Sequence, residues 1–447
     1  MTKREKLKRM MKMNIIRHIL PSDEIIPSAA YRVWINGKEI FVHQCPAASF
    51  CTLSAEGKLE VEIEALFDFS AFRIRPLSRQ IDFRVQERKI RFTLNGPGKL
   101  SIEPDGDIRN PLFILINPLE AEPADPDAPG VKYFAGGRVY HAGLIELQAG
   151  ETLYIEEGAF VYGNVVARHA DGVRIMGRGI LCGYHLDLKK ESPSHQMIRI
   201  IESENVLLEG ITLLGGPSWH AVPVACKNVT IRDMNIITFK GTGDGIDLVG
   251  SEGVIVSNCF VRSMDDCVAI KAVGYMDDAG CKNVRNIRVS GCVFWNAEWG
   301  NAIEIGFETR AEEIRDIIFE DIDVIRAEFE GFQSGGTFTI HNGDRACVSN
   351  ILYQNIRVED SREKLIDMKI LFSQYSRDKE RGQIRDITLR DISIADGPFP
   401  VSIIRGYDGA HMIENINIEN LTVHGKKIEN AMDAKMVVEL SRNVTFK

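Results

Sequence analysis

The chain has 447 residues, of which 44 % are hydrophobic and 26 % are charged, a composition typical of water-soluble globular proteins. Its formal net charge of −9 argues against nucleic acid as a main ligand, because phosphate binding requires a basic surface. No run of about 18 apolar residues occurs, so we expect no membrane-spanning segment.

The first 20 residues are rich in Lys and Arg, and Arg17 and His18 interrupt their apolar stretch. No small-residue cleavage site follows, which makes a poor signal peptide, so we interpret residues 1–20 as a disordered tail. The nine cysteines are an odd number without a Cys-x-x-Cys pair, which favours reduced thiols over a disulfide framework. Together these features predict a cytoplasmic protein.

Residues 21–130 are expected to form a small β-sandwich. They contain short alternating segments, such as residues 59–63 and 89–94, and turn sequences such as Asn95-Gly96. Short strands at this spacing are typical of an antiparallel sandwich. The Pro- and acid-rich stretch 120–130 is the predicted linker to a second domain, residues 131–447.

A nine-residue pattern recurs in the second domain. Each copy begins with Asn, Asp or Gly, has apolar residues at positions two, four, seven and nine, and has a small polar residue or Gly at position six. Copies begin at Gly172, Asn205, Asn228, Gly253, Asn286, Asp316, Asn350, Asp386, Asn415 and, truncated, Asn443. The copies begin 23 to 36 residues apart, a period that marks a solenoid.

Within each copy the apolar positions alternate, which predicts two short strands joined by a bend. Asn, Asp and Gly tolerate the left-handed backbone angles that a bend needs. We therefore predict an all-β fold in which residues 131–447 form a right-handed parallel β-helix. The alternative, a sandwich of hairpins, would need two-residue turns such as Asn-Gly, which are rare in the repeat region.

Three segments of the repeat region join a polar start to an apolar strand. Aligned on their strands, Asp244, Asp266 and Asn301 share one column, and Asp265 lies beside it. Because neighbouring strands lie about 4.8 Å apart, stacked coils would gather three carboxylates in one patch. Crowded carboxylates raise each other's pKa, which places a protonated acid beside an ionised base, as glycoside hydrolysis requires. A solvated turn is the alternative for the Asp265-Asp266 pair alone.

The segment 243–247, Gly-Asp-Gly-Ile-Asp, is followed by Asp265-Asp266, which lie 21 and 22 residues after Asp244. This pattern resembles glycoside hydrolase family 28, the polygalacturonases, and is similar to family 49, the dextranases, which share the β-helix and the three-Asp site. The resemblance covers roughly residues 135–447 and implies inverting hydrolysis without a metal or organic cofactor. It implies that Asp265 is the general acid and that Asp244 and Asp266 activate water. An inverting site usually separates acid and base by about 6.5–9.5 Å.

Two family motifs are absent. Polygalacturonases carry Gly-His-Gly where this chain has Gly300-Asn301-Ala302, and Arg-Ile-Lys where it has Thr337-Phe338-Thr339. The loss of a charge-assisted contact to a carboxylate weakens the case for galacturonate. Lys271 and Arg310 lie near enough in sequence to supply other cations. The sequence therefore leaves two substrates open, a pectin-related saccharide and a neutral α-glucan, which dextranases cleave on a similar two-domain architecture.

Further candidates for substrate binding flank the three Asp residues. Glu304 and Asp247 alternate with inward apolar residues and should face the groove, unless they serve only solubility. His220 aligns one coil before Asp244, and Trp299 offers an aromatic face to a sugar ring. The predicted substrate-binding residues are Asn301, Glu304, Trp299, His220, Lys271, Arg310 and His341.

We therefore expect a glycosidase whose partner is a carbohydrate, with no nucleic acid or membrane partner; the sequence does not determine the oligomeric state. Two other classes compete. A pectate-lyase-like eliminase would need Ca²⁺ among clustered carboxylates and a basic residue, which the aligned column does not show. A non-catalytic, carbohydrate-binding β-helix would gain nothing from crowding three carboxylates.

Overall fold

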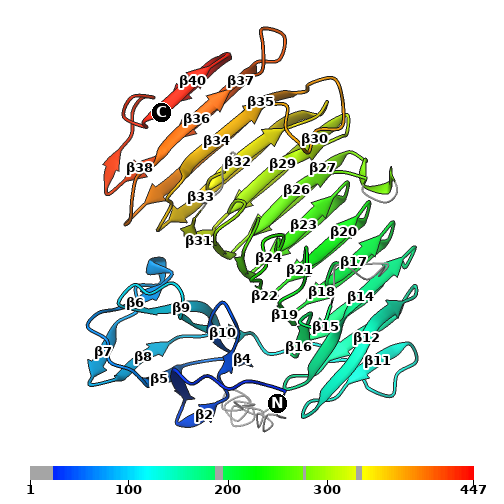
Figure 1. Cartoon of the computed structure of the whole chain (residues 1–447), viewed down its shortest axis with the longest axis vertical. Helices are drawn as coiled ribbons and strands as arrows, with labels where there is room; N and C mark the ends of the chain where they lie inside the picture. Colours follow the sequence, from blue (N-terminus) through cyan, green and yellow to red (C-terminus); the bar gives the residue numbers. More distant parts are fainter. Residues whose placement is uncertain (1–23, 187–194, 275–277, 329–334) are drawn as a thin grey trace, which may run out of the picture.

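The computed structural model describes residues 24–186, 195–274, 278–328 and 335–447 (Figure 1). The predicted tail, residues 1–20, lies outside them. Among the described residues, the helical elements are two short 3-10 turns, Leu77–Arg79 and Asp278–Gly280. In the same part of the chain, no helix is long and apolar enough to cross a membrane. The fold is all-β, as predicted.

The N-terminal part forms two five-stranded sheets packed on one apolar core. The first sheet contains β1 (Tyr31–Ile35), β2 (Lys38–Ile40), β5 (Leu59–Ala65), β7 (Phe83–Gln86) and β8 (Lys89–Leu94). The second contains β3 (His43–Gln44), β4 (Ser49–Ser54), β6 (Phe72–Arg75), β9 (Gly98–Pro104) and β10 (Leu112–Asn117). All pairs are antiparallel except β4 with β10, which pair in parallel. This is the predicted sandwich with one parallel pair added.

The remaining strands form one sheet of 31 strands that begins with β11 at Val131 and coils into a parallel β-helix. Its coils stack three series of strands, which run as a column from bottom to top in Figure 1. The series that carries the candidate site is β17 (Ile198–Ile201), β20 (Ala221–Val224), β23 (Ile246–Val249), β26 (Val268–Ala272), β29 (Ile303–Thr309), β32 (Phe338–Asn342), β34 (Lys364–Ile370), β36 (Val401–Arg405) and β40 (Met436–Glu439).

The other two series contain the predicted repeats. The second series is β11 (Val131–Phe134), β13 (Thr152–Ile155), β15 (Arg174–Gly177), β18 (Glu204–Glu209), β21 (Lys227–Arg232), β24 (Glu252–Ser257), β27 (Val284–Ser290), β30 (Glu313–Glu320), β33 (Cys347–Val358), β35 (Gln383–Ile394), β37 (Ile413–Glu419) and β41 (Ser441–Phe446). The third is β12 (Val139–Leu147), β14 (Phe160–Arg168), β16 (Ile180–Cys182), β19 (Thr212–Leu214), β22 (Asn235–Ile237), β25 (Phe260–Ser263), β28 (Val293–Asn296), β31 (Asp323–Ala327), β38 (Thr422–Val423) and β39 (Lys426–Lys427). The ends of β33 and β35 continue into this series.

The bend between the two series lies where the repeat predicts it. Position six of the pattern has a positive φ, for example 57° at Asp233, 55° at Asn258 and 64° at Gly291. Position one also has a positive φ, and its side chains bond from coil to coil: Asn350 Nδ2 donates to Asp316 Oδ1 at 2.6 Å. The Asn, Asp and Gly residues of the repeat therefore fix the corners of the coil.

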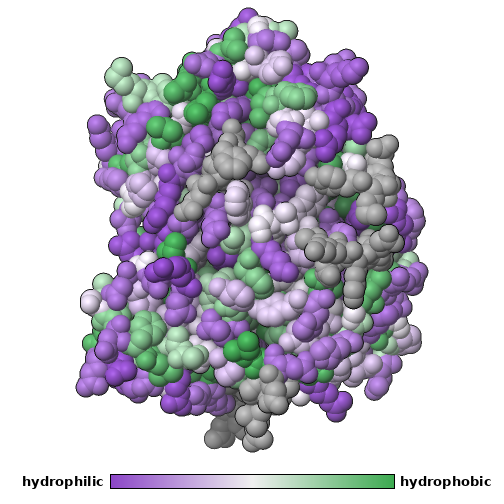
Figure 2. Space-filling view, in the orientation of Figure 1, coloured by the Kyte–Doolittle hydropathy of each residue, from purple (hydrophilic) through white to green (hydrophobic). Residues whose placement is uncertain are grey.

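The sandwich packs against the side of the β-helix formed by the third series. An apolar cluster there joins Phe50 and Phe113 of the sandwich to Phe260 and Trp295 of the β-helix. The nine cysteines are free thiols, and seven of them are buried. On the face shown in Figure 2, hydrophilic side chains predominate and apolar residues are scattered. The apolar contact between the two parts thus involves the third series of strands and not the series that carries the candidate site.

Candidate functional site

The strand register brings the predicted column together. Ile246 of β23 pairs with Val268 of β26, which pairs with Ile303 of β29. Asp244, Asp266 and Asn301 each lie two residues before these partners, so they share one column, as predicted.

The coil before this column differs from the prediction by one residue. Ala221 of β20 pairs with Ile246, so Trp219, rather than His220, lies beside Asp244. The ring of Trp219 is half-buried, whereas His220 points into the protein. The predicted alignment of His220 with Asp244 is therefore wrong by one residue, because Ala221, and not Val222, pairs with Ile246.

Three carboxylates converge at the start of β23 and β26. One oxygen each from Asp244, Asp265 and Asp266 lies within 4.8 Å of the other two. Asp244 and Asp266 are buried, whereas Asp265 is half-buried and accepts the backbone N–H of Asp266 at 3.0 Å. A Cβ on Gly300 would lie 2.3 Å from Asp265 Oδ1, and Gly300 has φ of +67°, so only glycine leaves room for this carboxylate.

Lys271, on β26, lies beneath the three carboxylates. Its ammonium donates to Asp244 Oδ2 at 2.7 Å and lies 3.0 Å from Asp247 Oδ1 and 3.8 Å from Asp266 Oδ2. It also lies 4.0 Å from the centroid of the Trp219 ring. Burial lowers the pKa of Lys271, but the charges of Asp244 and Asp247 outweigh it and hold this pKa well above its usual value. Lys271 is therefore a fixed counter-ion of the carboxylates, a role different from the predicted contact with substrate.

Asn301 orients Asp266. Its Nδ2 donates to Asp266 Oδ1 at 2.8 Å, and its Oδ1 accepts the backbone N–H of Gly336 at 2.9 Å. Both ends of the amide are thus engaged inside the protein, and the side chain is buried. Since a donor to a carboxylate favours its ionised form, Asn301 stabilises a negative charge on Asp266 where we predicted a substrate contact.

The pKa values of Asp265 and Asp266 are both raised by their surroundings. Burial, followed by the charge of Asp244, raises the pKa of Asp265 well above its usual range, and burial with the charge of Asp265 does the same for Asp266. Lys271 favours the ionised form of both residues, whereas the hydrogen bond from Asn301 acts on Asp266. Asp265 is the more exposed of the two.

Glu304 and Asp247 share the next column of the same sheet, which is the face we predicted. Neither has exposed surface, so they do not form the floor of an open groove as predicted. Burial and the charge of Asp244 raise the pKa of Asp247 well above its usual range. Glu304 accepts the hydroxyl of Thr339 and contacts His341 Nδ1 at 3.0 Å.

Both histidine candidates are fully buried and do not line the groove. His220 Nδ1 donates to the backbone oxygen of Asp244 at 3.0 Å, and burial lowers its pKa to about 4, so it is a neutral support for the strand. His341 lies between Glu304 and Asp367, 3.2 Å from the latter. The expected position of His341 on the groove rim is therefore wrong, because its ring is enclosed between side chains of neighbouring coils.

The model of glycosyl hydrolases family 28 matches residues 181–441. The chain belongs to family 28. A probable polygalacturonase of Arabidopsis thaliana is 24 % identical over 196 residues, 42 % of this chain and 39 % of the relative. An exopolygalacturonase of Zea mays is 27 % identical over 195 residues, 42 % of this chain and 43 % of the relative. The match thus spans about two fifths of the length of these relatives.

Solved structures share the fold of this family 28 chain. Dex49A from Penicillium minioluteum aligns with a TM-score of 0.61 and 15 % identity over 93 % of this chain and 92 % of that one. A hyperthermoactive exopolygalacturonase from Thermotoga maritima aligns with a TM-score of 0.55 and 17 % identity over 71 % of this chain and 84 % of that one. At these identities the likeness shows the fold alone. In this chain that fold is a β-helix preceded by a sandwich.

Two of the predicted substrate-binding residues, Trp299 and Arg310, are partly exposed. Trp299 is 41 % exposed, and its indole lies 3.7 Å from the position that a Cβ on Gly241 would take, in the loop before Asp244. Arg310 is half-buried and forms an ion pair with Asp378 at 3.3 Å. The ring of Trp299 is therefore open to solvent beside this loop, and its contact with a sugar stays a prediction, whereas Arg310 is already paired with a carboxylate.

Sequence reasoning missed two members of the site. Trp219 packs on Lys271, as described above, and escaped notice because of the one-residue shift. Glu308 is buried, and its charge raises the pKa of both Asp265 and Lys271. Glu308 follows a register shift in the pairing of β26 with β29, so the alternation that places Glu304 does not extend to it.

The donor set around Asp265 does not fit a divalent metal ion. Three carboxylate oxygens within 4.8 Å of one another are a common arrangement for such ions. Here the ammonium of Lys271 already contacts two of the same carboxylates and would repel a second cation. The positive charge that balances this cluster is therefore supplied by the chain itself.

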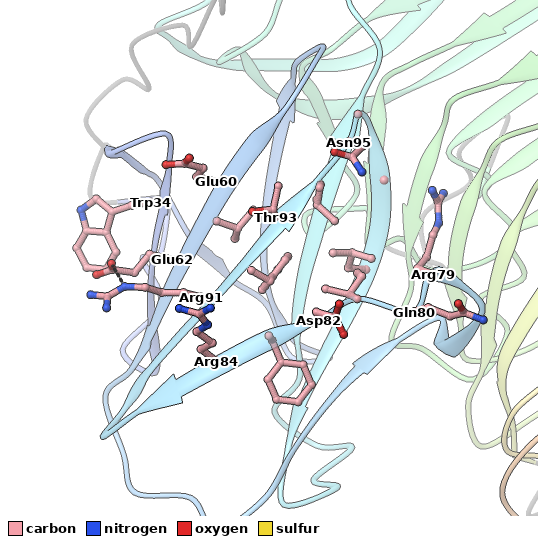
Figure 3. A pocket seen from close by; sticks show the side chains of 18 of the residues that line it. Trp34, Glu60, Glu62, Arg79, Gln80, Asp82, Arg84, Arg91, Thr93 and Asn95 are labelled. Carbon is pink, nitrogen blue, oxygen red and sulfur yellow. Dashed lines mark hydrogen bonds and ion pairs between the residues drawn. The ribbon is translucent and has the colours of Figure 1, made fainter.

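A separate hollow of about 1380 Å³ lies on the sandwich and is lined only by residues of that part (Figure 3). Three of its charged residues are paired with one another: Glu62 accepts from Lys89 at 2.8 Å and from Arg91 at 2.6 Å. Lys89 lies 5.5 Å from the centroid of the Trp34 ring. The carboxylates that share Lys271 as a counter-ion lie in the β-helix and not in this hollow. We therefore interpret the hollow as a solvated sheet face.

Proposed function

We propose that this chain is a glycosidase that hydrolyses an O-glycosidic bond in a pectin-related saccharide with inversion of configuration. The observation that carries the proposal is the convergence of Asp244, Asp265 and Asp266, of which Asp265 is half-buried. General acid–base work by such groups contributes about 10²–10⁴-fold to the rate.

In the proposed mechanism, Asp265 protonates the leaving glycosidic oxygen. Asp244 and Asp266 hold and deprotonate the attacking water. A water that donates to two acceptors, each about 2.8 Å from its oxygen and at a near-tetrahedral angle to one another, holds those acceptors about 4.5 Å apart. The carboxylate oxygens of the three Asp residues lie within 4.8 Å of one another, so one water can bridge two of them. Asp244 Oδ1 is buried and has no hydrogen-bond donor among the described residues, so it is the oxygen best suited to take the proton.

The carboxylates are closer together than the usual rule for inversion requires. Inverting glycosidases usually separate the two carboxyl groups by about 6.5–9.5 Å, and retaining ones by about 5–5.5 Å. The oxygens here lie within 4.8 Å, so distance does not favour inversion. Our proposal of inversion rests on the resemblance to family 28, and the anomer released first from the substrate tests it.

The substrate class is proposed from the curated relatives, which are polygalacturonases. A neutral α-glucan is the second candidate, and two observations favour it. The coil that carries Arg-Ile-Lys in polygalacturonases has Thr337-Phe338-Thr339 here, all buried. Lys271 and Arg310, the predicted replacements, are both engaged by carboxylates of the protein. A substrate without a carboxylate would leave no charge unpaired at this site.

An eliminase is disfavoured by Lys271. Elimination needs a neutral base that removes a proton next to the sugar carboxylate. The basic residue that contacts Asp244 and Asp266 is Lys271. Its pKa is held well above the usual value by Asp244 and Asp247. A lysine that stays protonated acts as a counter-ion and is a poor general base.

The experiment is a reducing-sugar assay of purified protein with polygalacturonate, rhamnogalacturonan, dextran and oligosaccharides of each, with and without EDTA. ¹H NMR of the first product reports its anomeric configuration. We expect EDTA-insensitive release from a pectic substrate with the inverted anomer. Release from dextran alone would establish the second candidate, and a retained anomer would overturn the water-activating roles of Asp244 and Asp266. No release from any substrate would support a non-catalytic, carbohydrate-binding β-helix.

A further inference from the structure

A chain of buried charged side chains runs away from the candidate site along the same sheet. Glu304 on β29, His341 on β32 and Asp367 on β34 come from three successive coils and have no exposed surface. His341 Nδ1 lies 3.0 Å from each carboxylate oxygen of Glu304, and its Nε2 lies 3.2 Å from Asp367 Oδ2. Both ring nitrogens thus face carboxylates.

This arrangement requires a protonated imidazole. A neutral imidazole has one N–H, so one of its ring nitrogens would face a carboxylate oxygen with no proton between them, whereas the imidazolium donates to both carboxylates. Burial lowers the pKa of His341, but Glu304 and Asp367 outweigh it and raise this pKa to about 9. Phe307 stacks on the ring at a centroid distance of 4.4 Å and an interplanar angle of 11°. The ring is therefore fixed in place and positively charged at neutral pH.

The far end of the chain is balanced by lysines. Lys369 Nζ lies 2.9 Å from Asp367 Oδ1, and Lys364 Nζ lies 3.6 Å from Asp367 Oδ2. Although burial raises it, hydrogen bonds from His341 and Lys369 hold the pKa of Asp367 below its usual range. Asp367 therefore has its own counter-ions, and the charge of His341 is available to Glu304.

The near end of the chain acts on Asp266. Glu304 pairs in the strand register with Ala269, three residues after Asp266. Burial and the charges of Asp265 and Asp244 raise the pKa of Asp266, Lys271 lowers it, and the charge of Glu304 adds to the rise. Lys271 is shared among three Asp residues. The positive charge that is bonded to Glu304 itself is the imidazolium of His341.

We propose that His341 is a positioning residue whose imidazolium compensates the charge of Glu304 and so keeps Asp266 ionised as a base for water. The inference rests on the proposed hydrolysis but concerns residues that lie one and two coils away from the three Asp residues. Nothing in the reaction requires Glu304 or His341 to touch the substrate. Their effect passes through space as charge, which is why a buried, low-dielectric position suits it.

The test uses three variants of the full chain: His341→Gln, Glu304→Gln and the double variant. Gln keeps hydrogen-bonding groups near the partner atoms and removes the charge in each case. For His341→Gln, we expect the acid limb of the kcat/KM pH profile to move up by about one pH unit, a tenfold loss below the limb. For Glu304→Gln we expect the acid limb to move to lower pH. In the double variant we expect the acid limb to lie near its position in the wild type.

Thr339→Val is the matched control. The Thr339 hydroxyl donates to the same Glu304 carboxylate, so its removal weakens the packing of Glu304 without changing any charge. We expect a loss of thermal stability and no shift of the limb. Shifts in the same direction for all variants, or none, would overturn the proposal, because a purely structural role does not change sign. If His341→Gln does not fold, Glu304→Gln alone tests the proposal: an acid limb at the same pH as in the wild type would overturn it.

A second readout separates this inference from the proposed activity. Titration of ¹³C-labelled Asp carboxyl groups by NMR follows the Asp265 and Asp266 pair directly and needs no substrate, with assignment from Asp266→Asn. The same signs of shift are expected there. If the wild type has no glycosidase activity but the titrations shift as stated, the hydrolase proposal fails and the charge compensation by His341 stands. If activity is present and the titrations do not shift, the inference fails alone.

Discussion

Two buried clusters of charge are built on opposite plans. One lies between the sandwich and the β-helix, where Arg75 contacts Glu103 at 3.1 Å and Glu359 at 2.5 Å. Beside it, Arg326 contacts Asp360 at 2.8 Å and Glu103 at 3.6 Å. Each carboxylate there has a guanidinium partner. We call these five residues the seam cluster.

The other cluster lies under the candidate site. Five carboxylates, those of Asp244, Asp247, Asp265, Asp266 and Glu308, surround the ammonium of Lys271. Like charges that share one counter-ion raise each other's pKa, whereas in the seam cluster burial raises the pKa of Glu359 to about 7 and Arg75 opposes that rise. The contrast shows that this excess of negative charge is not needed to join strands or domains. It therefore indicates acid–base function, and charge substitutions in the two clusters should have opposite consequences.

The largest effect is expected for Asp265→Asn. Asparagine keeps the size of the side chain but cannot protonate a leaving group, so kcat should fall by about 10²–10⁴-fold. The melting temperature should stay the same or rise, because one of the crowded charges is removed. Kinetic assays and thermal unfolding of the same preparations check both parts, with Asp127→Asn in the exposed linker as the matched control. Retention of more than about a tenth of the activity would exclude Asp265 as the acid.

The converse is expected for Arg75→Met in the seam cluster. The substitution keeps an apolar stem but leaves Glu103 and Glu359 without this partner, and breaking a buried ion pair costs about 3–5 kcal/mol. The free energy of unfolding in denaturant should fall by that amount, while kcat per folded molecule stays unchanged. Arg32→Met, which breaks an exposed pair with Glu39, should cost less than about 1 kcal/mol. A large loss of kcat in Arg75→Met would show that the two clusters are not independent.

A smaller effect, dependent on pH, is expected from His341. Its pKa is raised to about 9 in the folded chain, above the usual value of about 6.5 for histidine. Protonation therefore stabilises the fold fully below a pH of about 6.5, and this contribution is lost as pH rises through about 9. It amounts to about 3 kcal/mol. The difference in unfolding free energy between the wild type and His341→Gln should shrink across this interval. A constant difference would show that the ring is neutral.

The sequence predicted the column of the site but not what covers it. The alternation of Ile246 and Leu248 with polar residues sets the face of each strand, and the spacing of the repeat sets the order of the coils. This was enough to bring Asp244 and Asp266 together. The alternation does not reveal which outward side chains are covered by other parts of the chain, so Glu304 and His341 were expected in the groove and are buried.

The remaining errors concern the register of single coils. The place predicted for His220 was one residue out and holds Trp219, and the register shift between β26 and β29 brings in Glu308. Lys271 was recognised as a cation of the site, but the direction of a long, flexible side chain depends on the carboxylates around it. Most of those carboxylates come from other coils, and their distances from Lys271 are not written in the local sequence.

The smallest effect is expected for Trp299→Ala, at the exposed edge of the site. If the indole packs on a sugar ring, its loss should raise KM by about tenfold, equal to about 1.4 kcal/mol, with a much smaller change in kcat. Substrate saturation curves and thermal unfolding of the variant check this. Because Trp299 takes no part in the charge cluster, the pH profile should not move.

Phe83→Ala on the sandwich sharpens this comparison. Phe83 is 40 % exposed, nearly the same as the 41 % of Trp299, and it lines the hollow of the sandwich. If substrate contacts only the β-helix, Phe83→Ala should leave KM unchanged for short and long saccharides alike. An increase in KM confined to long saccharides would mean that the substrate extends onto the sandwich, so the solvated face would then be part of the binding surface. Equal effects of both variants on every substrate would show that exposed aromatic rings act here through stability, and Trp299 would lose its proposed contact with the sugar.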